Sequence, residues 1–302
     1  LRDFEEDFFQ NQDILNDDRN IIKVMKLGEV ETVVKSFKTP NLFQAIIYKF
    51  FRKSKAKRSF ENSKLLKSRG VNVPEPLGYI EVFDRYRLRQ CYFISSKLNF
   101  NFTLDAATDK KIDGYKDILS DFIHFTYDLH KKNIMHLDYG VGNICIKKTR
   151  NGYDFYLIDL NRLKEGIVSP KKGIKNLARI SNDPEIVKIF ADAYAKKISS
   201  SALKTHKELK KFVYQVGLRV KLKKLLKSFI ENIKHVPLSS YEWDYHSNQP
   251  HTLKSKKLKN KIFFLAFFSN LKIIFATLYA CVVAPYFFLR DKESFEKCPN
   301  IS

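Results

Sequence analysis

The sequence predicts an α+β fold in which a small β-rich part with one main helix precedes a larger, mostly helical part. Short runs of β-branched and aromatic residues, separated by turn signals, recur through the first hundred residues. From about residue 115, apolar residues recur at spacings of three and four, which is typical of helices. A lysine-rich and then strongly apolar stretch predicts a further C-terminal extension. We therefore expect three parts, at residues 1–98, 99–235 and 236–302.

In the first part we expect two hairpin strands at 21–27 and 30–35, because Gly28-Glu29 supplies a turn between two β-rich runs. A basic connection with scattered aromatic residues, 37–55, should lead to one helix. That helix is expected over 56–69 and ends at Gly70, where the missing Cβ permits a left-handed residue. Two further strands are expected at 79–83 and 91–95.

In the second part an amphipathic helix is expected from Tyr115 to about Lys132. Two β-like runs, 143–147 and 155–158, follow on either side of a turn at Arg150-Asn151-Gly152. The chain beyond Leu163 is expected to be helical.

Charge is concentrated near the C-terminal end. The chain holds 55 Lys and Arg against 33 Asp and Glu, a net charge of +22. Residues 196–261 alone hold 17 basic and 4 acidic residues, 17 − 4 = +13. Such a stretch favours a polyanion: nucleic acid, a phosphorylated glycolipid or an anionic membrane surface. No nucleic-acid-binding motif accompanies the lysines, so we expect no nucleic acid partner.

Four cysteines lie far apart, which argues against a disulfide framework or a structural zinc site. The acidic stretch 1–13 lacks an apolar core, so we expect no secretory signal there.

The residues that predict chemistry begin at His136-Leu137-Asp138. Asn143 follows five residues after Asp138, and Asp159 stands at the end of the next β-like run. Phosphoryl transfer needs such a set, because its catalysis is positioning and charge neutralisation. Asp159 and Asn143 would supply oxygen ligands to Mg²⁺, while Asp138 would accept a hydrogen bond from the acceptor hydroxyl.

A cation is also needed on the nucleotide phosphates, and Lys35 is well placed at the end of the second strand. Glu61, on the helix that follows, is the expected partner that holds Lys35. His136 is expected only to organise its loop.

In this order and spacing the sequence resembles protein-kinase-like phosphotransferases, and in particular the bacterial lipopolysaccharide kinase family, which phosphorylates Kdo or heptose of the inner core. The resemblance covers about residues 21–233. It rests on the lysine strand, the glutamate helix, H-x-D-x-x-x-x-N and an I-D strand end, and it extends to the stretches 33–38, 58–61, 70–76, 136–143, 158–162 and 175–179. It implies a two-lobed kinase-like fold, ATP and Mg²⁺ as cofactors, and a glycolipid or lipopolysaccharide precursor as partner.

The sequence also departs from regulated protein kinases. Only Gly28 stands where a glycine-rich loop would precede Lys35, Leu137 replaces the usual arginine, and no A-P-E follows Asp159. The last two features favour a small-molecule or glycolipid acceptor over a protein. Because a single glycine stands in place of a glycine-rich loop, an alternative stays open. In it the fold is catalytically inactive and binds lipid or protein as a scaffold at the membrane surface.

Two interpretations compete for the C-terminal extension. Five lysines between 254 and 261 precede a mostly apolar run, 262–289. The run is either a pair of buried helices or a membrane anchor whose lysines meet anionic headgroups. We expect the second, which would place the catalytic part at the cytoplasmic face of the inner membrane, either peripheral or anchored by residues 262–289.

Overall fold

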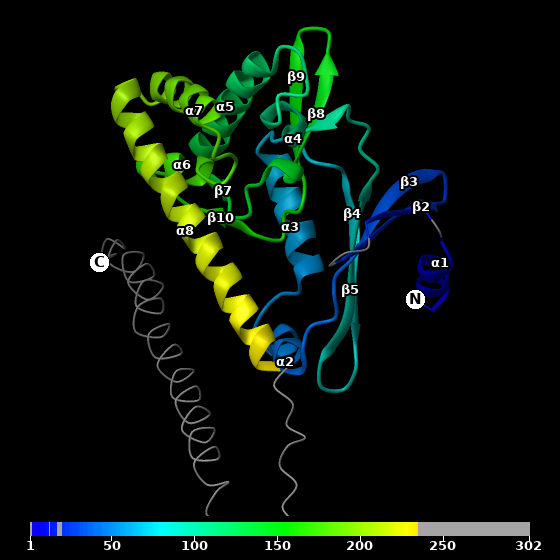
Figure 1. Cartoon of the computed structure of the whole chain (residues 1–302). Coiled ribbons are helices and arrows are strands. Elements are labelled where there is room, and N and C mark those ends of the chain that lie inside the picture. The colour runs from blue at the N-terminus through cyan, green and yellow to red at the C-terminus, as the bar shows by residue number, and fades with distance from the viewer. Residues whose placement is uncertain (1, 12, 17–19, 235–302) are drawn as a thin grey trace, which may run out of the picture. The chain divides into compact units, whose positions relative to one another are not determined.

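The computed structural model describes residues 2–11, 13–16 and 20–234. Its first part is a five-stranded antiparallel sheet in the order β1-β2-β3-β5-β4. The strands are β1 (Ile14–Asn16), β2 (Ile21–Leu27), β3 (Val30–Ser36), β4 (Pro76–Phe83) and β5 (Leu88–Ser96). Figure 1 shows this sheet on the right, with the helix-rich second part on the left.

The expected hairpin is confirmed. β2 and β3 pair with Leu27 opposite Val30, and Gly28 in the turn has φ +64°, a left-handed conformation that glycine adopts without strain. Lys35 stands near the end of β3, opposite Ile22 on one side and Phe93 on the other. The register therefore fixes this lysine in the middle strand of the sheet.

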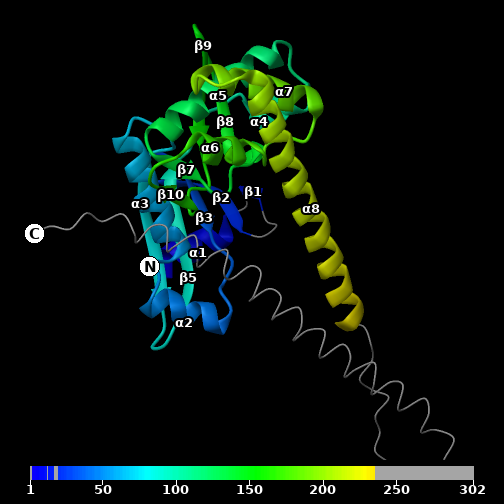
Figure 2. The ribbon, with the colours of Figure 1, turned by 90° about the vertical axis from the view of Figure 1, so that its left-hand side faces the viewer.

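The main helix is also where the sequence places it. α3 spans Lys55–Ser68, begins at the Ser54 side chain, which accepts the Lys57 N–H, and ends before Gly70 at φ +63°. It packs against β4 and β5. In Figure 1 it lies between the sheet and the strands β7 and β10 of the second part, and the turned view of Figure 2 shows it at the left, above α2.

Two helices of the first part were not expected. α1 (Arg2–Gln10) packs Phe4 and Phe8 against Tyr92 of the sheet, and α2 (Leu42–Phe50) occupies part of the basic connection predicted at 37–55. Asn41 starts α2 by accepting the Gln44 N–H.

The second part contains the large hydrophobic core. Its helices are α4 (Leu104–Thr108), α5 (Tyr115–Lys131), α6 (Pro170–Leu177), α7 (Pro184–Lys197) and α8 (Ala202–Lys234). Its strands are β6 (Phe102–Thr103), β7 (Ile134–His136), β8 (Ile144–Thr149), β9 (Gly152–Leu157) and β10 (Leu163–Glu165), with a short 3₁₀ helix η1 at Val141–Asn143. The expected α+β class, β-rich first and helical afterwards, is confirmed.

The core of this part forms around α5. Ile118, Phe122 and Leu129 are fully or almost fully buried, as their spacing predicts, and α7 packs along the same helix. The hairpin β8–β9 pairs Ile144 with Leu157 and turns next to Gly152. The short pair β7–β10 brings His136 opposite Leu163.

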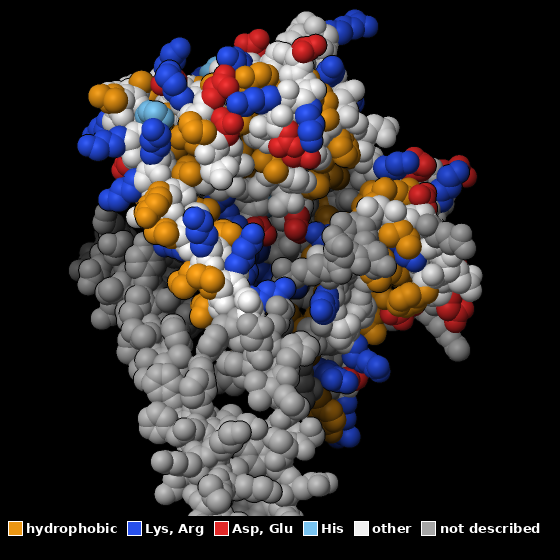
Figure 3. All heavy atoms as spheres, viewed as in Figure 1, with side chains coloured by type: hydrophobic (Ala, Val, Ile, Leu, Met, Phe, Trp, Pro, Cys, Tyr) orange, Lys and Arg blue, Asp and Glu red, His pale blue; other side chains and the backbone are white. Residues whose placement is uncertain are grey.

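α8 is the most basic helix described. Figure 3 shows Lys and Arg side chains gathered over it, while several of its apolar side chains, Leu203, Tyr214, Leu222 and Leu225, are more than half exposed. Among the helices of the described chain, none combines the length and the hydropathy of a membrane span. The predicted apolar run, 262–289, and the whole third part, 236–302, lie outside the described residues.

Candidate active site

The structure brings together the lysine and the acid that stand 124 residues apart in the chain. The Lys35 ammonium donates to Asp159 Oδ1 at 2.7 Å, and the two side chains are 14% and 25% exposed. Lys35 comes from β3 of the sheet and Asp159 from the loop after β9. The sheet and the second part therefore meet at this ion pair.

Asp159 is held in an unusual backbone conformation. Its φ is +55°, which costs a non-glycine residue free energy and is found most often at functional sites. Burial by itself raises the pKa of Asp159, but the Lys35 ammonium and the Asn161 amide together lower it below the ordinary value. The carboxylate is therefore ionised at neutral pH, as a metal ligand must be.

Asn143 lies beside Asp159. The Asn143 carbonyl accepts the Ile158 N–H at 3.0 Å, which ties the end of η1 to the residue before Asp159. The Asn143 Nδ2 donates to the Asp138 carbonyl at 2.9 Å. That bond fixes the orientation of the amide and leaves its oxygen for a ligand.

Asp138 lies in the loop after β7, and a buried histidine stabilises this loop by a hydrogen bond. The buried His136 Nδ1 accepts the Asp138 N–H at 3.2 Å. Burial lowers the pKa of His136 more than the nearby Asp159 carboxylate raises it, so the ring is neutral. The expected loop-organising role of His136 is confirmed.

The expected pair of Lys35 with Glu61 is wrong. Glu61 lies on α3, but its carboxylate accepts from Lys53 at 2.8 Å, and Lys35 pairs with Asp159 instead. The reason is helical phase: the face of α3 that meets the Asp159 loop carries positions 58 and 62. Residue 61 is turned about 100° from residue 62, toward Lys53.

Two residues on that face of α3 hold the Asp159 loop, and the sequence did not single them out for this. Asn62 Nδ2 donates to the Leu160 carbonyl at 2.6 Å, and Arg58 donates to the Asn161 carbonyl at 3.0 Å. Asn161 in turn donates to Asp159 Oδ1 at 2.6 Å. The only signal in the sequence was a pair of long polar side chains four residues apart on one helix face.

A second arginine reaches the site from the other side. Arg179, which follows α6, donates to Asp138 Oδ1 at 3.1 Å, with both side chains more than 40% exposed. An exposed pair of this kind contributes little to stability. It does place a positive charge directly beside the acid that is expected to orient the acceptor.

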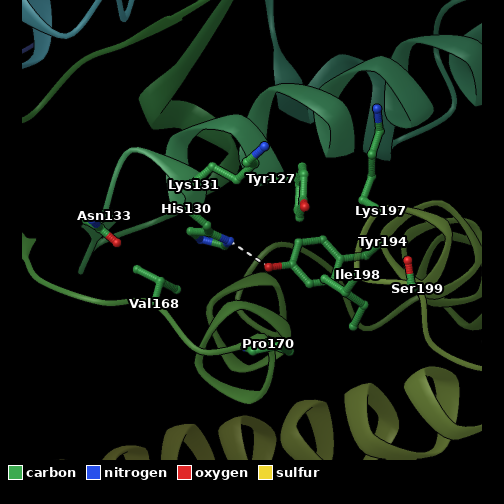
Figure 4. Close-up of a pocket in the computed structure, with 10 residues that line it drawn as sticks. All are labelled: Tyr127, His130, Lys131, Asn133, Val168, Pro170, Tyr194, Lys197, Ile198 and Ser199. Atoms are coloured by element: carbon green, nitrogen blue, oxygen red, sulfur yellow. Dashed lines mark hydrogen bonds between the residues drawn. The ribbon is translucent and has the colours of Figure 1, made fainter.

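Beneath this loop, a buried hydrogen-bond chain connects α5, α6 and α7. His130 meets the Tyr194 hydroxyl at 2.9 Å and Asn176 Oδ1 at 3.2 Å, and Asn176 Nδ2 donates to the His136 carbonyl at 3.0 Å. Figure 4 shows His130 facing Tyr194 in a cavity of about 390 Å³ that Pro170 and Val168 also line. None of the five predicted site residues lines this cavity, so it is separate from the predicted site.

Acid should destabilise the fold through His130. Burial lowers the pKa of His130 to about 4, against 6.5 for the exposed ring, so the unfolded chain binds more protons between those values. Stability is therefore retained above about pH 6.5 and lost as the pH falls toward 4. We expect the free energy of unfolding to fall by at least about 2 kcal/mol from pH 7 to pH 5, with His136 adding in the same direction.

Urea denaturation at the two pH values measures this loss. His130→Gln should show a loss about 2 kcal/mol smaller than the wild type, because no ring remains to be protonated there. His124→Gln, on the exposed side of the same helix, is the matched control and should behave as the wild type. Equal pH dependence of His130→Gln and the wild type would contradict the expectation.

The buried hydrogen-bond chain through His130 and Tyr194 leaves no room for a side chain at Gly173 of α6. A Cβ at this position would overlap the Tyr194 hydroxyl and come within 3.0 Å of His130 Nδ1. We expect Gly173→Ala to lower the free energy of unfolding by about 2 kcal/mol or more, since it overpacks a buried site and displaces a hydrogen bond.

Thermal and urea denaturation check this, with Gly217→Ala in α8 as the control. Nothing lies within 4 Å of a Cβ at Gly217, and alanine favours a helix, so that variant should be neutral or slightly more stable. A Gly173→Ala protein as stable as the wild type would show that Tyr194 moves aside at no cost.

The donor set fits a hard divalent cation. Asp159 Oδ2 and Asn143 Oδ1 lie on neighbouring backbone segments and accept no hydrogen bond from the described residues. Mg²⁺ takes oxygen ligands of this kind. The described residues contain no cluster of three or more His, Cys, Asp or Glu that could hold a metal. Two protein oxygens suit Mg²⁺, which usually keeps waters and substrate phosphates as its other ligands.

Comparison with solved structures bears on the fold of the chain. No curated protein matches the sequence. Among solved structures, the chain is similar to WaaP in complex with acyl carrier protein, with a TM-score of 0.50 and 12% identity over 72% of this chain and 91% of that one. This likeness supports the kinase-like fold. A MAP kinase, LmaMPK10 from Leishmania major, matches less well, with a TM-score of 0.38 and 14% identity over 69% of this chain and 64% of that one.

The sequence itself gives the family. The model of the lipopolysaccharide kinase (Kdo/WaaP) family matches residues 36–198, more than half of the chain. The match begins one residue after Lys35 and includes Asp138, Asn143 and Asp159. This chain therefore belongs to the lipopolysaccharide kinase (Kdo/WaaP) family.

Proposed function

We propose that this lipopolysaccharide kinase transfers the γ-phosphoryl group of ATP to a sugar hydroxyl of the inner core, on Kdo or heptose, or of a related glycolipid precursor. The observation that carries the proposal is the Lys35–Asp159 ion pair, with Asn143 beside it and Asp138 on the adjoining loop. These are the residue types that phosphoryl transfer requires, in one place.

Each residue has a distinct task in this proposal. Asp138 accepts the hydrogen bond of the acceptor hydroxyl and orients its oxygen toward the γ-phosphorus. Lys35, held in the middle of the sheet, neutralises charge on the nucleotide phosphates, and it exchanges its bond to Asp159 for a phosphate oxygen. Asp159 and Asn143 would hold Mg²⁺, which supplies further charge neutralisation on the phosphates.

Glu61 has no part in this proposal, because its carboxylate is paired with Lys53. Arg58 and Asn62 take over the coupling between α3 and the site, since they fix the loop that carries Asp159. Both act as positioning residues through backbone carbonyls.

We further propose that the enzyme works at the cytoplasmic face of the inner membrane, where its glycolipid acceptor is made. The lysines of α8 support this, because each lysine near an anionic surface contributes about 1 kcal/mol to binding. Lipid flotation of the full chain, with anionic and with zwitterionic vesicles, tests it: binding to anionic vesicles that disappears at high salt is expected.

Transfer of label from γ-labelled ATP to Kdo-lipid A and to a heptosylated acceptor tests the activity, and mass spectrometry of the product identifies the hydroxyl. Label on the glycolipid is the expected result. Absence of transfer to both acceptors, together with absence of thermal stabilisation by millimolar Mg-ATP, would reject the proposal and favour the scaffold alternative.

A further inference from the structure

The helix α8 packs against the protein only along its first half. There Leu209 and Phe212 are buried in the hydrophobic core of the second part, and Val213 and Val216 pack against that core. From residue 217 to residue 228, by contrast, every residue is exposed. Figure 2 shows this end of α8 extending away from the other described elements. The second half of the helix therefore lies outside the core of the described chain.

The exposed half nevertheless carries an apolar stripe. Leu218, Leu222 and Leu225 recur at spacings of four and three. Tyr214 lies one turn before them, and Leu226 lies at the edge of the same face. We call these five residues the apolar stripe; their exposed fractions run from 36% to 68%. The stripe covers about 120° of the helix, the width by which a helix normally buries one face against another surface.

The apolar stripe points away from the body of the protein. At 100° per residue, Leu218 lies about 180° around the helix from the buried Leu209. Leu222 and Leu225 lie within about 40° of Leu218. The first half of α8 therefore packs inward, whereas the second half presents its leucines outward. Because the stripe is on the opposite side, the core that buries Leu209 does not cover it.

The remainder of the second half is basic. Among residues 217–228 none is acidic and five are basic: Arg219, Lys221, Lys223, Lys224 and Lys227. Arg219 and Lys221 border the stripe, each about 20° beyond one of its edges. Long basic side chains in such positions keep their charge at the level of polar headgroups while the apolar side chains between them lie deeper.

This combination of charge and apolar area favours an anionic lipid surface over other partners. A second copy of the chain on the stripe would bring two sets of five cations together with no acid in either segment, which is unfavourable. Nucleic acid would attract the cations, but its bases stack on aromatic side chains and leave a row of leucines without a role. An anionic bilayer meets both requirements, since its headgroups attract the cations and its acyl chains accept the leucines.

We propose that residues 214–228 of α8 lie in the plane of an anionic membrane surface, with the apolar stripe inserted below the headgroups. The inference rests on the proposed location of the enzyme at the inner membrane, and it names the element that makes the contact. Since Leu209 and Phe212 fix the same helix to the core, this contact holds the second part of the protein, including the Asp138 loop, beside the membrane that carries the glycolipid acceptor.

Tryptophan fluorescence in the full chain tests whether the stripe is inserted. Trp243 is the only tryptophan of the chain, so Trp243→Phe removes the background emission. In that background, Leu222→Trp places a probe in the stripe. Val220→Trp is the matched control, because Val220 is 49% exposed against 57% for Leu222 and lies about 160° around the same helix.

The probe in the stripe should enter the bilayer and the control probe should not. With vesicles of phosphatidylglycerol and phosphatidylcholine in equal parts, the emission of Leu222→Trp should shift to shorter wavelength. Its quenching by lipids brominated on their acyl chains should exceed that of Val220→Trp severalfold, since the apolar face of such a helix lies about 5–10 Å into the headgroup boundary. Vesicles of phosphatidylcholine alone should give a much smaller shift, because they lack the anionic charge.

Three results would overturn the proposal. Equal quenching of the two probes on the anionic vesicles would show that the stripe is not inserted. A shift of Leu222→Trp without vesicles would assign the stripe to a second copy of the chain if it rises with protein concentration, and to the C-terminal extension of the same chain if it does not. A shift with RNA in place of vesicles would assign the basic half of α8 to nucleic acid.

The measurement is independent of catalysis, since it needs neither ATP nor a glycolipid acceptor. A severalfold difference in quenching in a chain that transfers no label would uphold the membrane contact while the proposed activity fails. Equal quenching in a chain that does transfer label would refute the membrane contact alone.

Discussion

Asp138→Asn should lower kcat for phosphoryl transfer about a thousandfold and leave the fold and nucleotide binding intact. The amide keeps the size of the carboxylate but is a far weaker acceptor for the proton of the attacking hydroxyl, and general base catalysis contributes about 10²- to 10⁴-fold. The Asp138 side chain is 41% exposed, and among the described residues its carboxylate bonds to the exposed Arg179 alone, so its loss costs little stability.

The measurement is the initial rate of label transfer to the glycolipid at saturating substrates, with Mg-ATP stabilisation recorded in parallel. Asp128→Asn on the exposed side of α5 is the control and should retain wild-type activity. A rate within tenfold of the wild type would remove Asp138 from the catalytic set. Loss of Mg-ATP stabilisation would show that its role is in nucleotide binding instead.

Asp159→Asn should abolish both transfer and the stabilisation by Mg-ATP. The substitution removes the negative charge that Lys35 contacts at 2.7 Å and one of the two oxygens proposed for Mg²⁺. The pKa of Asp159 lies below its ordinary value, so a full charge is lost at every pH at which the enzyme would be assayed. We expect a fall in kcat of about a thousandfold or more, because charge neutralisation is the main contribution to phosphoryl transfer.

Comparison with Asp138→Asn separates a loss of Mg-ATP binding from a loss of catalysis alone. Thermal stabilisation as a function of Mg-ATP concentration should survive in Asp138→Asn and vanish in Asp159→Asn. Folding of Asp159→Asn is checked by circular dichroism, since Lys35 would lose its charged partner. If both variants bind Mg-ATP as the wild type does, Asp159 is not a metal ligand.

Much of the fold could be predicted from local patterns. The hairpin around Gly28, the helix ended by Gly70 and the amphipathic α5 each follow from turn chemistry, capping and a spacing of three and four, all of which act within a few residues. α1 and α2 were missed, because each is only nine residues long and such a short helix gains its stability from packing on the sheet.

The sequence predicts which residues form the site but not all of their contacts. Asp138, Asn143, Asp159 and Lys35 are predicted from the order of residue types along the chain, and the structure brings Lys35 and Asp159 together. The wrong partner for Lys35 shows the limit: one step of 100° around α3 decides whether residue 61 or residue 62 meets the loop, and the sequence does not give the phase of a helix relative to a distant loop.

By itself the sequence determined which chemistry is available: two acids, a carboxamide and a lysine in the right order, and a strongly basic chain. Only the tertiary structure decided that Lys35 meets Asp159 and that Arg179 lies beside Asp138. It also decided that Arg58 and Asn62 of α3 hold the loop that carries Asp159. The physical reason is the separation along the chain over which each kind of interaction acts. Periodicity, capping and turn preferences act over a few residues, whereas these contacts join positions 41 to 124 residues apart and depend on how β3, α3 and the β7–β10 pair pack.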